Sequence, residues 1–512
     1  METGVYKSRL KNARRNIVSG FIKQFSGIII TFLIRTVIIN ALGANYQGIN
    51  GLFTSILQIL NLSDLGFSTA VTFVLYKPIA DDNYDEVSAI MAFLKKTYVI
   101  IGGVILGIGL IITPFLPNLI SADYPNELNI YVLFLIYLFN TVISYLLFAY
   151  KSTLLTAWQR DDVVSKIYTL TSIGVKASQL LLLLIFKNFY VYILVMPIGT
   201  VINNLLIHFS SKKLFPQITP SGIINKDTKF ELTRQVKSVF INRISDIARN
   251  SFDDIIISAF LGLTAVTVYD NYYYIFTALI GIMGIVIHSI RASIGNSIVR
   301  ESVEKNYGDM MKFTFIFMWI AGWFSVCLFC LYQPFMLLWM NGRPNLLLSN
   351  MNMALFCLYF YFFCMAHTKG VYLEAKGLFW ECRFLYIIEA LANLVLNIGL
   401  GYLLGITGIL LATLLSLLIV NFYGGTIILF KNYYKKSCTS FILTHFLYFL
   451  ITICNCFLTA IICNQISLNG LIGLLVKMLI CLIIPNLFFF CCYCKTKAFK
   501  NSFLLIKKAL RK

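Results

Sequence analysis

Apolar stretches of about 20 residues, separated by short polar segments, follow one another along the whole 512-residue chain. A helix of that length crosses the ~30 Å hydrocarbon core of a bilayer. The pattern therefore predicts an all-α, polytopic membrane protein with about fourteen transmembrane helices. The expected ranges are 17–42, 47–76, 97–118, 128–150, 167–186, 189–211, 236–261, 266–290, 313–339, 346–366, 384–404, 405–430, 441–463 and 470–493.

The composition narrows the class further. Hydrophobic residues make up 59% of the chain and charged residues only 12%, against about 25% charged in soluble proteins. This excludes a large soluble enzyme, a disordered scaffold and a nucleic-acid-binding domain. The thirteen cysteines lack the spacing of a secreted disulfide framework. The runs Cys327-Leu-Phe-Cys330 and Cys491-Cys492-Tyr-Cys494 are typical of packing cysteines, with metal binding, or lipid attachment for the second run, as the alternative.

Basic residues are distributed very unevenly between the two sides of the predicted membrane. With the N-terminus inside, 34 of the 42 Lys and Arg residues fall in inner segments, and only Lys187 and Arg343 fall in outer loops. Lys and Arg collect on the cytoplasmic side of membrane proteins. We therefore expect both termini in the cytoplasm.

A polar segment at 212–235 interrupts the pattern after the sixth helix. We expect an N-terminal lobe at 1–211, a cytoplasmic linker at 212–235, a C-terminal lobe at 236–430, and a final helix pair with a basic tail at 431–512. A shift of 219 residues places Leu42-Gly43 on Leu261-Gly262, each at the end of the first helix of its lobe. Six helices separate the copies, so the two lobes form a parallel, pseudo-symmetric repeat.

Ionisable side chains inside the spans are the candidate functional residues, because at membrane depth such groups usually face a bundle interior or a water-filled cavity. The helix expected at 236–261 carries Arg243, Asp246, Arg249, Asn250, Asp253 and Asp254, most of them on one face. Other spans contribute Lys23, Arg35, Asp64, Lys176 and Glu389. The alternative is internal ion pairing, such as Arg243 with Asp246, and Lys23 could instead snorkel to the interface.

Three separated runs carry a family resemblance. Leu42-Gly-Ala-Asn-Tyr-Gln-Gly-Ile-Asn-Gly-Leu-Phe-Thr54, with Asp64-Leu65-Gly66 and Leu75-Tyr76-Lys77-Pro78 after it, resembles the polysaccharide-transporter (Wzx-type) lipid-linked oligosaccharide flippases of the multidrug/oligosaccharidyl-lipid/polysaccharide (MOP) exporter superfamily. The runs Asn250-Ser-Phe-Asp253-Asp254-Ile-Ile-Ile-Ser258 and Ala375-Lys-Gly-Leu-Phe-Trp380, continuing to Glu389 and Asn393, agree. In the 377–386 loop the chain departs from similar proteins, with Cys382 and Tyr386 where Asp and Pro often stand.

The resemblance implies a flippase that is not an enzyme. Such proteins carry polyprenyl-pyrophosphate-linked repeat units to the outer leaflet of the bacterial inner membrane by alternating access of a cationic cavity, for O-antigen, capsule or exopolysaccharide synthesis. Basic side chains would bind the pyrophosphate; the candidates are Arg35, Arg243, Arg249, Lys176 and Lys23. Expected partners are the lipid-linked oligosaccharide, membrane lipids and the polymerase machinery, with no nucleic acid. No cofactor or metal is expected besides a coupling H⁺ or Na⁺.

Acidic residues within the spans suit ion coupling or gating, and these are Asp64, Asp246, Asp253, Asp254 and Glu389. The 219-residue shift maps Arg35 onto Asp254, which predicts an outer gate between them unless the acidic pair balances Arg249 instead. A drug/cation antiporter of the same superfamily would favour an acidic cavity. A membrane-embedded glycan transferase or polymerase would need a catalytic constellation and a sizeable external loop, and the pattern provides neither.

Overall fold

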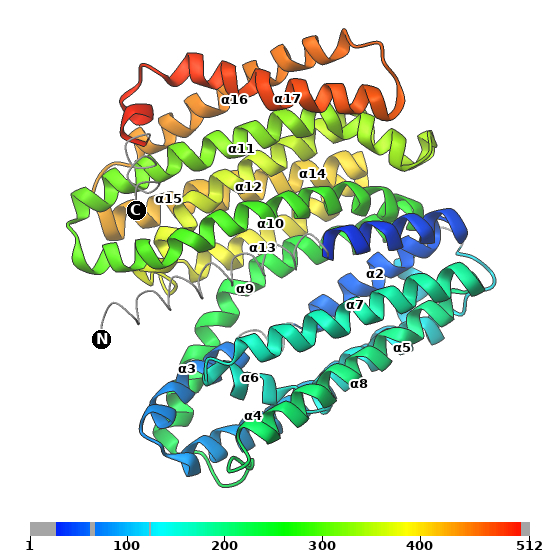
Figure 1. The fold of residues 1–512 in the computed structure, drawn as a ribbon, viewed down its shortest axis with the longest axis vertical. Coiled ribbons are helices and arrows are strands. Elements are labelled where there is room, and N and C mark those ends of the chain that lie inside the picture. The colour runs from blue at the N-terminus through cyan, green and yellow to red at the C-terminus, as the bar shows by residue number, and fades with distance from the viewer. Residues whose placement is uncertain (1–26, 62–66, 122–123, 503–512) are drawn as a thin grey trace. The chain divides into compact units, whose positions relative to one another are not determined.

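The computed structural model describes residues 27–61, 67–121 and 124–502, and these residues form helices and connecting turns with no strand (Figure 1). The helices are Gly27–Ala41, α2 (Ala44–Leu60), α3 (Phe67–Ala80), α4 (Tyr84–Ile112), α5 (Ile130–Leu146), α6 (Tyr150–Ala157), α7 (Asp161–Phe186), α8 (Phe189–Leu214), α9 (Lys226–Leu261), α10 (Leu263–Arg300), α11 (Val303–Trp339), α12 (Asn350–Lys376), α13 (Arg383–Leu404), α14 (Ile406–Leu415), α15 (Gly425–Leu429), α16 (Thr439–Asn464) and α17 (Gly470–Tyr493). The all-α polytopic fold class is confirmed.

Ten helical segments of the described chain are long and apolar enough to span a membrane, and an eleventh forms if α5 and α6, bent by 46°, count as one span. Two shorter apolar helices, Gly27–Ala41 and α3, lie outside this count. The described residues thus provide ten or eleven of the fourteen predicted spans, and the full number stays a prediction. The protein is therefore a multi-pass membrane protein.

Two compact units divide the chain. The first holds residues 1–243 together with Gly262–Thr264, and the second holds 244–261 and 265–512. In the first unit α8 packs along both α7 and α5, and α5 also contacts α4. Thr228 Oγ1 donates to Glu86 Oε1 (2.9 Å), which fixes the start of α9 to α4 within this unit.

Two glycines follow the two helices that the 219-residue shift pairs. Gly43 follows the helix Gly27–Ala41 with φ +114°, and Gly262 follows α9 with φ +82°. Both angles lie in the region that side chains with a Cβ rarely adopt, which explains glycine at these turns. Thr264 Oγ1 donates to Asn45 Oδ1 (2.6 Å) inside the first unit, and these two residues are again 219 apart.

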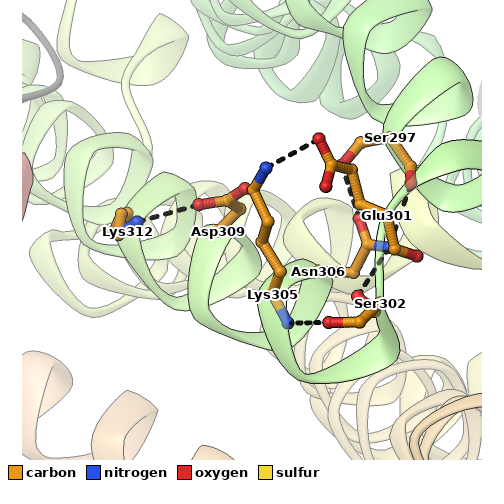
Figure 2. Close-up of polar contacts among 7 residues, drawn as sticks. All are labelled: Ser297, Glu301, Ser302, Lys305, Asn306, Asp309 and Lys312. Carbon is orange, nitrogen blue, oxygen red and sulfur yellow. Dashed lines mark hydrogen bonds and ion pairs between the residues drawn. The ribbon is translucent and has the colours of Figure 1, made fainter.

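In the second unit α11 lies side by side with α12, α16 and α17 (Figure 1). Polar side chains close the turn between α10 and α11 (Figure 2). The buried Asn306 donates from Nδ2 to the carbonyl oxygens of Ser297 (3.1 Å) and Ser302 (3.2 Å). Lys305 Nζ contacts Glu301 Oε1 at 2.6 Å on the exposed side of this turn.

Candidate functional site

Helix α13 buries only one stripe, and that stripe is polar. Its buried residues are Glu389, Asn393, Asn397 and Gly401, each four positions after the last and therefore on one face. The opposite face is apolar and exposed, with Leu391 at 57% and Val395 at 67%. This polarity is reversed from that of a soluble protein, because lipid surrounds the outside of the bundle.

Asp253 connects this stripe to two other helices. Its side chain is 2% exposed on α9. Tyr269 on α10 donates to Oδ2 at 2.7 Å, and Asn397 Nδ2 donates to Oδ1 at 2.7 Å. One buried carboxylate therefore receives hydrogen bonds from α10 and α13. Its neighbour Asp254 is also buried, at 7% exposed.

Oxygen atoms cluster around Asn397. Its Nδ2 also donates to Asn393 Oδ1 (3.2 Å), and Asn393 Nδ2 donates to Thr413 Oγ1 (3.3 Å) and Ser416 Oγ (3.3 Å). The Oδ1 atom of Asn397 is buried and has no hydrogen-bond partner. A buried polar atom without a partner usually marks a function or a bound ion or water. Carboxylate, amide and hydroxyl oxygens are ligands that hard cations prefer.

A second buried network lies at the other end of the stripe. Lys369 Nζ on α12 donates to Asn421 Oδ1 (2.8 Å), and Asn421 Nδ2 donates to Glu389 Oε2 (2.8 Å). Lys369 is 3% exposed and Glu389 is 1% exposed. Asn421 belongs to the π-helical segment Ser416–Gly424, and such segments are frequent at functional sites. Gly425 leaves room for the lysine, because a Cβ there would lie 2.7 Å from Lys369 Nζ.

In the first unit one predicted basic residue, Lys176, contacts the helix that carries another, Arg35. Lys176 Nζ on α7 donates to Thr31 Oγ1 (2.7 Å), and Arg35 lies one turn further along the helix Gly27–Ala41. Both basic side chains are half-buried. Three residues after Lys176, the buried Gln179 donates to the carbonyl oxygen of Tyr192 (3.2 Å). This region has the charge and the partial exposure needed to bind an anion.

Other predicted residues lie outside what the structure describes. Lys23 and Asp64 fall outside the described residues, and for Arg243, Asp246 and Arg249 only the backbone of α9 is described. Arg35 belongs to the first unit and Asp254 to the second. The gate between them stays a prediction.

The sequence alone does not single out several polar residues of these networks. Lys369 lies beyond the helix predicted at 346–366, whereas α12 continues to Lys376. Asn397, Tyr269 and Asn421 carry no charge, so the pattern of ionisable residues does not include them. One signal was available: Glu389, Asn393 and Asn397 recur every four residues in an otherwise apolar helix.

Comparisons with known proteins identify the fold. No protein-family model and no curated protein matches the sequence. Among solved structures, the lipid II flippase MurJ in an inward closed conformation matches with a TM-score of 0.67 at 16% identity, over 93% of this chain and 99% of that one. An inward-facing multidrug resistance MATE family transporter of the MOP superfamily matches with a TM-score of 0.61 at 14% identity, over 80% of this chain and 98% of that one. The chain therefore has the fold of MOP-superfamily transporters.

Proposed function

We propose that this protein is a flippase that moves polyprenyl-pyrophosphate-linked oligosaccharides from the inner to the outer leaflet of the bacterial inner membrane. The observation that carries the proposal is the extent of the structural match. The match to the lipid II flippase leaves 7% of the 512 residues, about 36, outside it. Helices α16 and α17 run from 439 to 493, so the shared fold includes part of this final pair.

Basic residues of the first unit supply the chemistry for the substrate. A pyrophosphate cannot cross hydrocarbon alone, whereas a polyprenyl tail is soluble there. Arg35 can pair with phosphate oxygens through two parallel hydrogen bonds. Lys176 adds a point charge at Thr31, which lies one helical turn before Arg35. Because both side chains are half-buried, a large ligand can reach them. The sugars of the bound repeat unit determine which polymer the cell builds. A polymerase that joins the repeat units on the outer face is the expected partner.

The buried oxygens of the second unit supply the energy coupling. Asp253, Asn393 and Asn397 offer a carboxylate and two amides, and one amide oxygen has no hydrogen-bond partner. This arrangement suits a proton on Asp253 or a small cation such as Na⁺ between the oxygens. Its burial excludes a sugar-sized ligand. We assign cation coupling to this site and treat Glu389, which contacts Asn421, as part of its support.

The alternative is a drug/cation antiporter, which the likeness to a multidrug MATE transporter and the buried carboxylate of Asp253 favour. An antiporter of organic cations would require anionic groups at its large, accessible site. In the described part of the first unit, the half-buried candidate residues Arg35 and Lys176 are instead basic. We therefore rank the flippase first.

Transport by the purified protein in liposomes separates the two functions. One assay follows an undecaprenyl-pyrophosphate-linked oligosaccharide until an external, membrane-impermeant lectin can bind it. The second assay follows a fluorescent organic cation. We expect flipping of the oligosaccharide lipid and no transport of the dye. Arg35→Ala should need a higher lipid concentration for flipping, while the exposed Arg160→Ala should not. Dye transport without lipid flipping would establish the antiporter instead.

A further inference from the structure

Three cysteines that are far apart in the sequence meet inside the second unit. Cys330 lies on α11, Cys463 on α16 and Cys481 on α17, and they are 8%, 2% and 1% exposed. Their sulfur atoms all lie within 4.8 Å of one another. None of these residues belongs to the proposed transport site. The convergence is specific, because each helix contributes one thiol to the same point.

The spacing of the sulfurs fits a single thiophilic ion. Zinc–sulfur bonds are about 2.3 Å long, so three sulfurs around one ion would lie roughly 4 Å apart. A shift of a few tenths of an ångström would be enough to reach that geometry. Hydrophobic side chains enclose the cluster, among them Val326, Phe329 and Ile480. Such surroundings hold the thiols in place.

Charge distinguishes between the possible ions. Three thiolates with Zn²⁺ carry one net negative charge, whereas three thiolates with Cu⁺ carry two. Lys477 lies one helical turn before Cys481 on α17, where residues four apart are neighbours. Its ammonium can balance the single charge of the zinc complex. Burying a net charge in an apolar region is costly, so the structure favours Zn²⁺.

A cavity lies near the cluster, although none of the three cysteines lines it. It has a volume of about 390 Å³, and its lining includes Gln333, Asn350, Asn469 and Lys477. Gln333 follows Cys330 by three residues, and Lys477 precedes Cys481 by four. Along α11 and α17, the lining of the cavity therefore comes within about one helical turn of Cys330 and Cys481. Water in it can serve as the fourth ligand and can carry away the thiol protons.

We propose that Cys330, Cys463 and Cys481 form a Zn²⁺ site that fastens the helix pair α16–α17 to α11. Binding replaces three S–H bonds by three Zn–S bonds and releases three protons to water, with no oxidation. Because the ligands come from three helices, the ion would stabilise their packing. This inference does not depend on the proposed transport function.

A metal-binding measurement on the full-length protein in detergent tests the proposal. The exposed Cys454, Cys491 and Cys492 and the half-exposed Cys494 are first replaced by serine to remove other thiols. Zinc is then titrated against a chromophoric chelator under reducing conditions. We expect one tight site per chain and the release of about three protons per ion. Cys330→Ser, Cys463→Ser and Cys481→Ser should each weaken zinc binding at least about tenfold.

Cys327 supplies the matched control, because it lies in the same sequence run but outside the trio, and its sulfur points to the carbonyl oxygen of Cys481 (3.8 Å). Cys327→Ser should retain the site. Zinc should also raise the thermal unfolding temperature of the parent protein but not of Cys481→Ser. If a serine variant does not fold, alkylation of the parent protein gives the answer, since zinc should protect these three thiols and leave Cys438 reactive.

Three results would overturn the proposal. They are the absence of a tight zinc site, zinc binding that all three serine variants retain, and a preference for Cu⁺ over Zn²⁺ when both are offered with the same chelator. Recovery of two of the three cysteines as a disulfide from freshly reduced protein would also count against it.

Discussion

Helices α7 and α13 have corresponding predicted positions in the two units, but their inner faces carry different polar residues. Each is the fifth predicted helix of its lobe, and each turns apolar residues outward, such as Ile185 at 68% exposed on α7 and Val395 at 67% on α13. The inner stripe of α7 includes the half-buried Lys176, whereas that of α13 holds the fully buried Glu389, Asn393 and Asn397. A half-buried cation can meet a large anion. A closed set of oxygens admits only a proton or a small cation.

The largest effect is expected for the buried network of the second unit. Replacing Lys369 by Ala leaves Glu389 and Asn421 in a buried site with one cation fewer. We expect a loss of about 3 kcal/mol in the free energy of unfolding, measured by denaturant titration in detergent. Lys305→Ala, at the exposed pair with Glu301, should cost less than about 1 kcal/mol. Equal losses for the two variants would show that the buried network stabilises the fold no more than the exposed pair does.

A somewhat smaller effect is expected for Asp253. Asp253→Asn keeps the size of the side chain but removes the charge that a proton or cation would neutralise. We expect gradient-driven flipping in liposomes to fall roughly thirtyfold, which corresponds to about 2 kcal/mol, while flipping without a gradient changes little. Asn397→Ala should act in the same direction, since it removes the amide that contacts Asp253. If both variants still respond fully to the gradient, cation coupling does not take place at this site.

The basic pair of the first unit should affect substrate binding. Arg35→Ala should weaken binding of the lipid-linked oligosaccharide about tenfold, and Arg35→Lys should recover part of it, because the charge remains and the planar fork is lost. Thr31→Val should have a smaller effect, through the hydrogen bond that holds Lys176. Binding can be measured by the change in tryptophan fluorescence during a lipid titration. Unchanged affinity in Arg35→Ala would assign the pyrophosphate to other residues.

The smallest effect concerns the space beside Lys369. Gly425→Ala would place a methyl group against its ammonium, and we expect a loss of about 1 kcal/mol from overpacking. Gly370→Ala, on the same helix as Lys369, has no atom near its added Cβ and should be neutral or slightly stabilising. Thermal unfolding in detergent compares the two. If Gly425→Ala is as neutral as Gly370→Ala, the lysine has freedom to move.

Much of the fold followed from the hydrophobic pattern, because an apolar stretch of about 20 residues satisfies its own backbone hydrogen bonds in a bilayer as a helix, and the helix length is set by the bilayer thickness. The glycines at 43 and 262 could be placed from the repeat alone. The site was harder to predict. Charged residues such as Asp253 and Glu389 are conspicuous in apolar spans, whereas Asn397 and Tyr269 become partners of Asp253 only through the packing of three helices. Lys369 lies beyond the apolar stretch at 346–366, and only the structure shows that α12 continues past it to Lys376.

In the proposed mechanism the first unit binds the pyrophosphate lipid and the second unit binds the coupling cation. The most direct test measures flipping in liposomes by the wild type, Arg35→Ala and Asp253→Asn, with the lipid concentration and the H⁺ or Na⁺ gradient varied independently. We expect Arg35→Ala to need more lipid and to keep its response to the gradient. We expect Asp253→Asn to keep its lipid requirement and to lose that response. If both variants change the same parameter, the two units do not divide the work in this way.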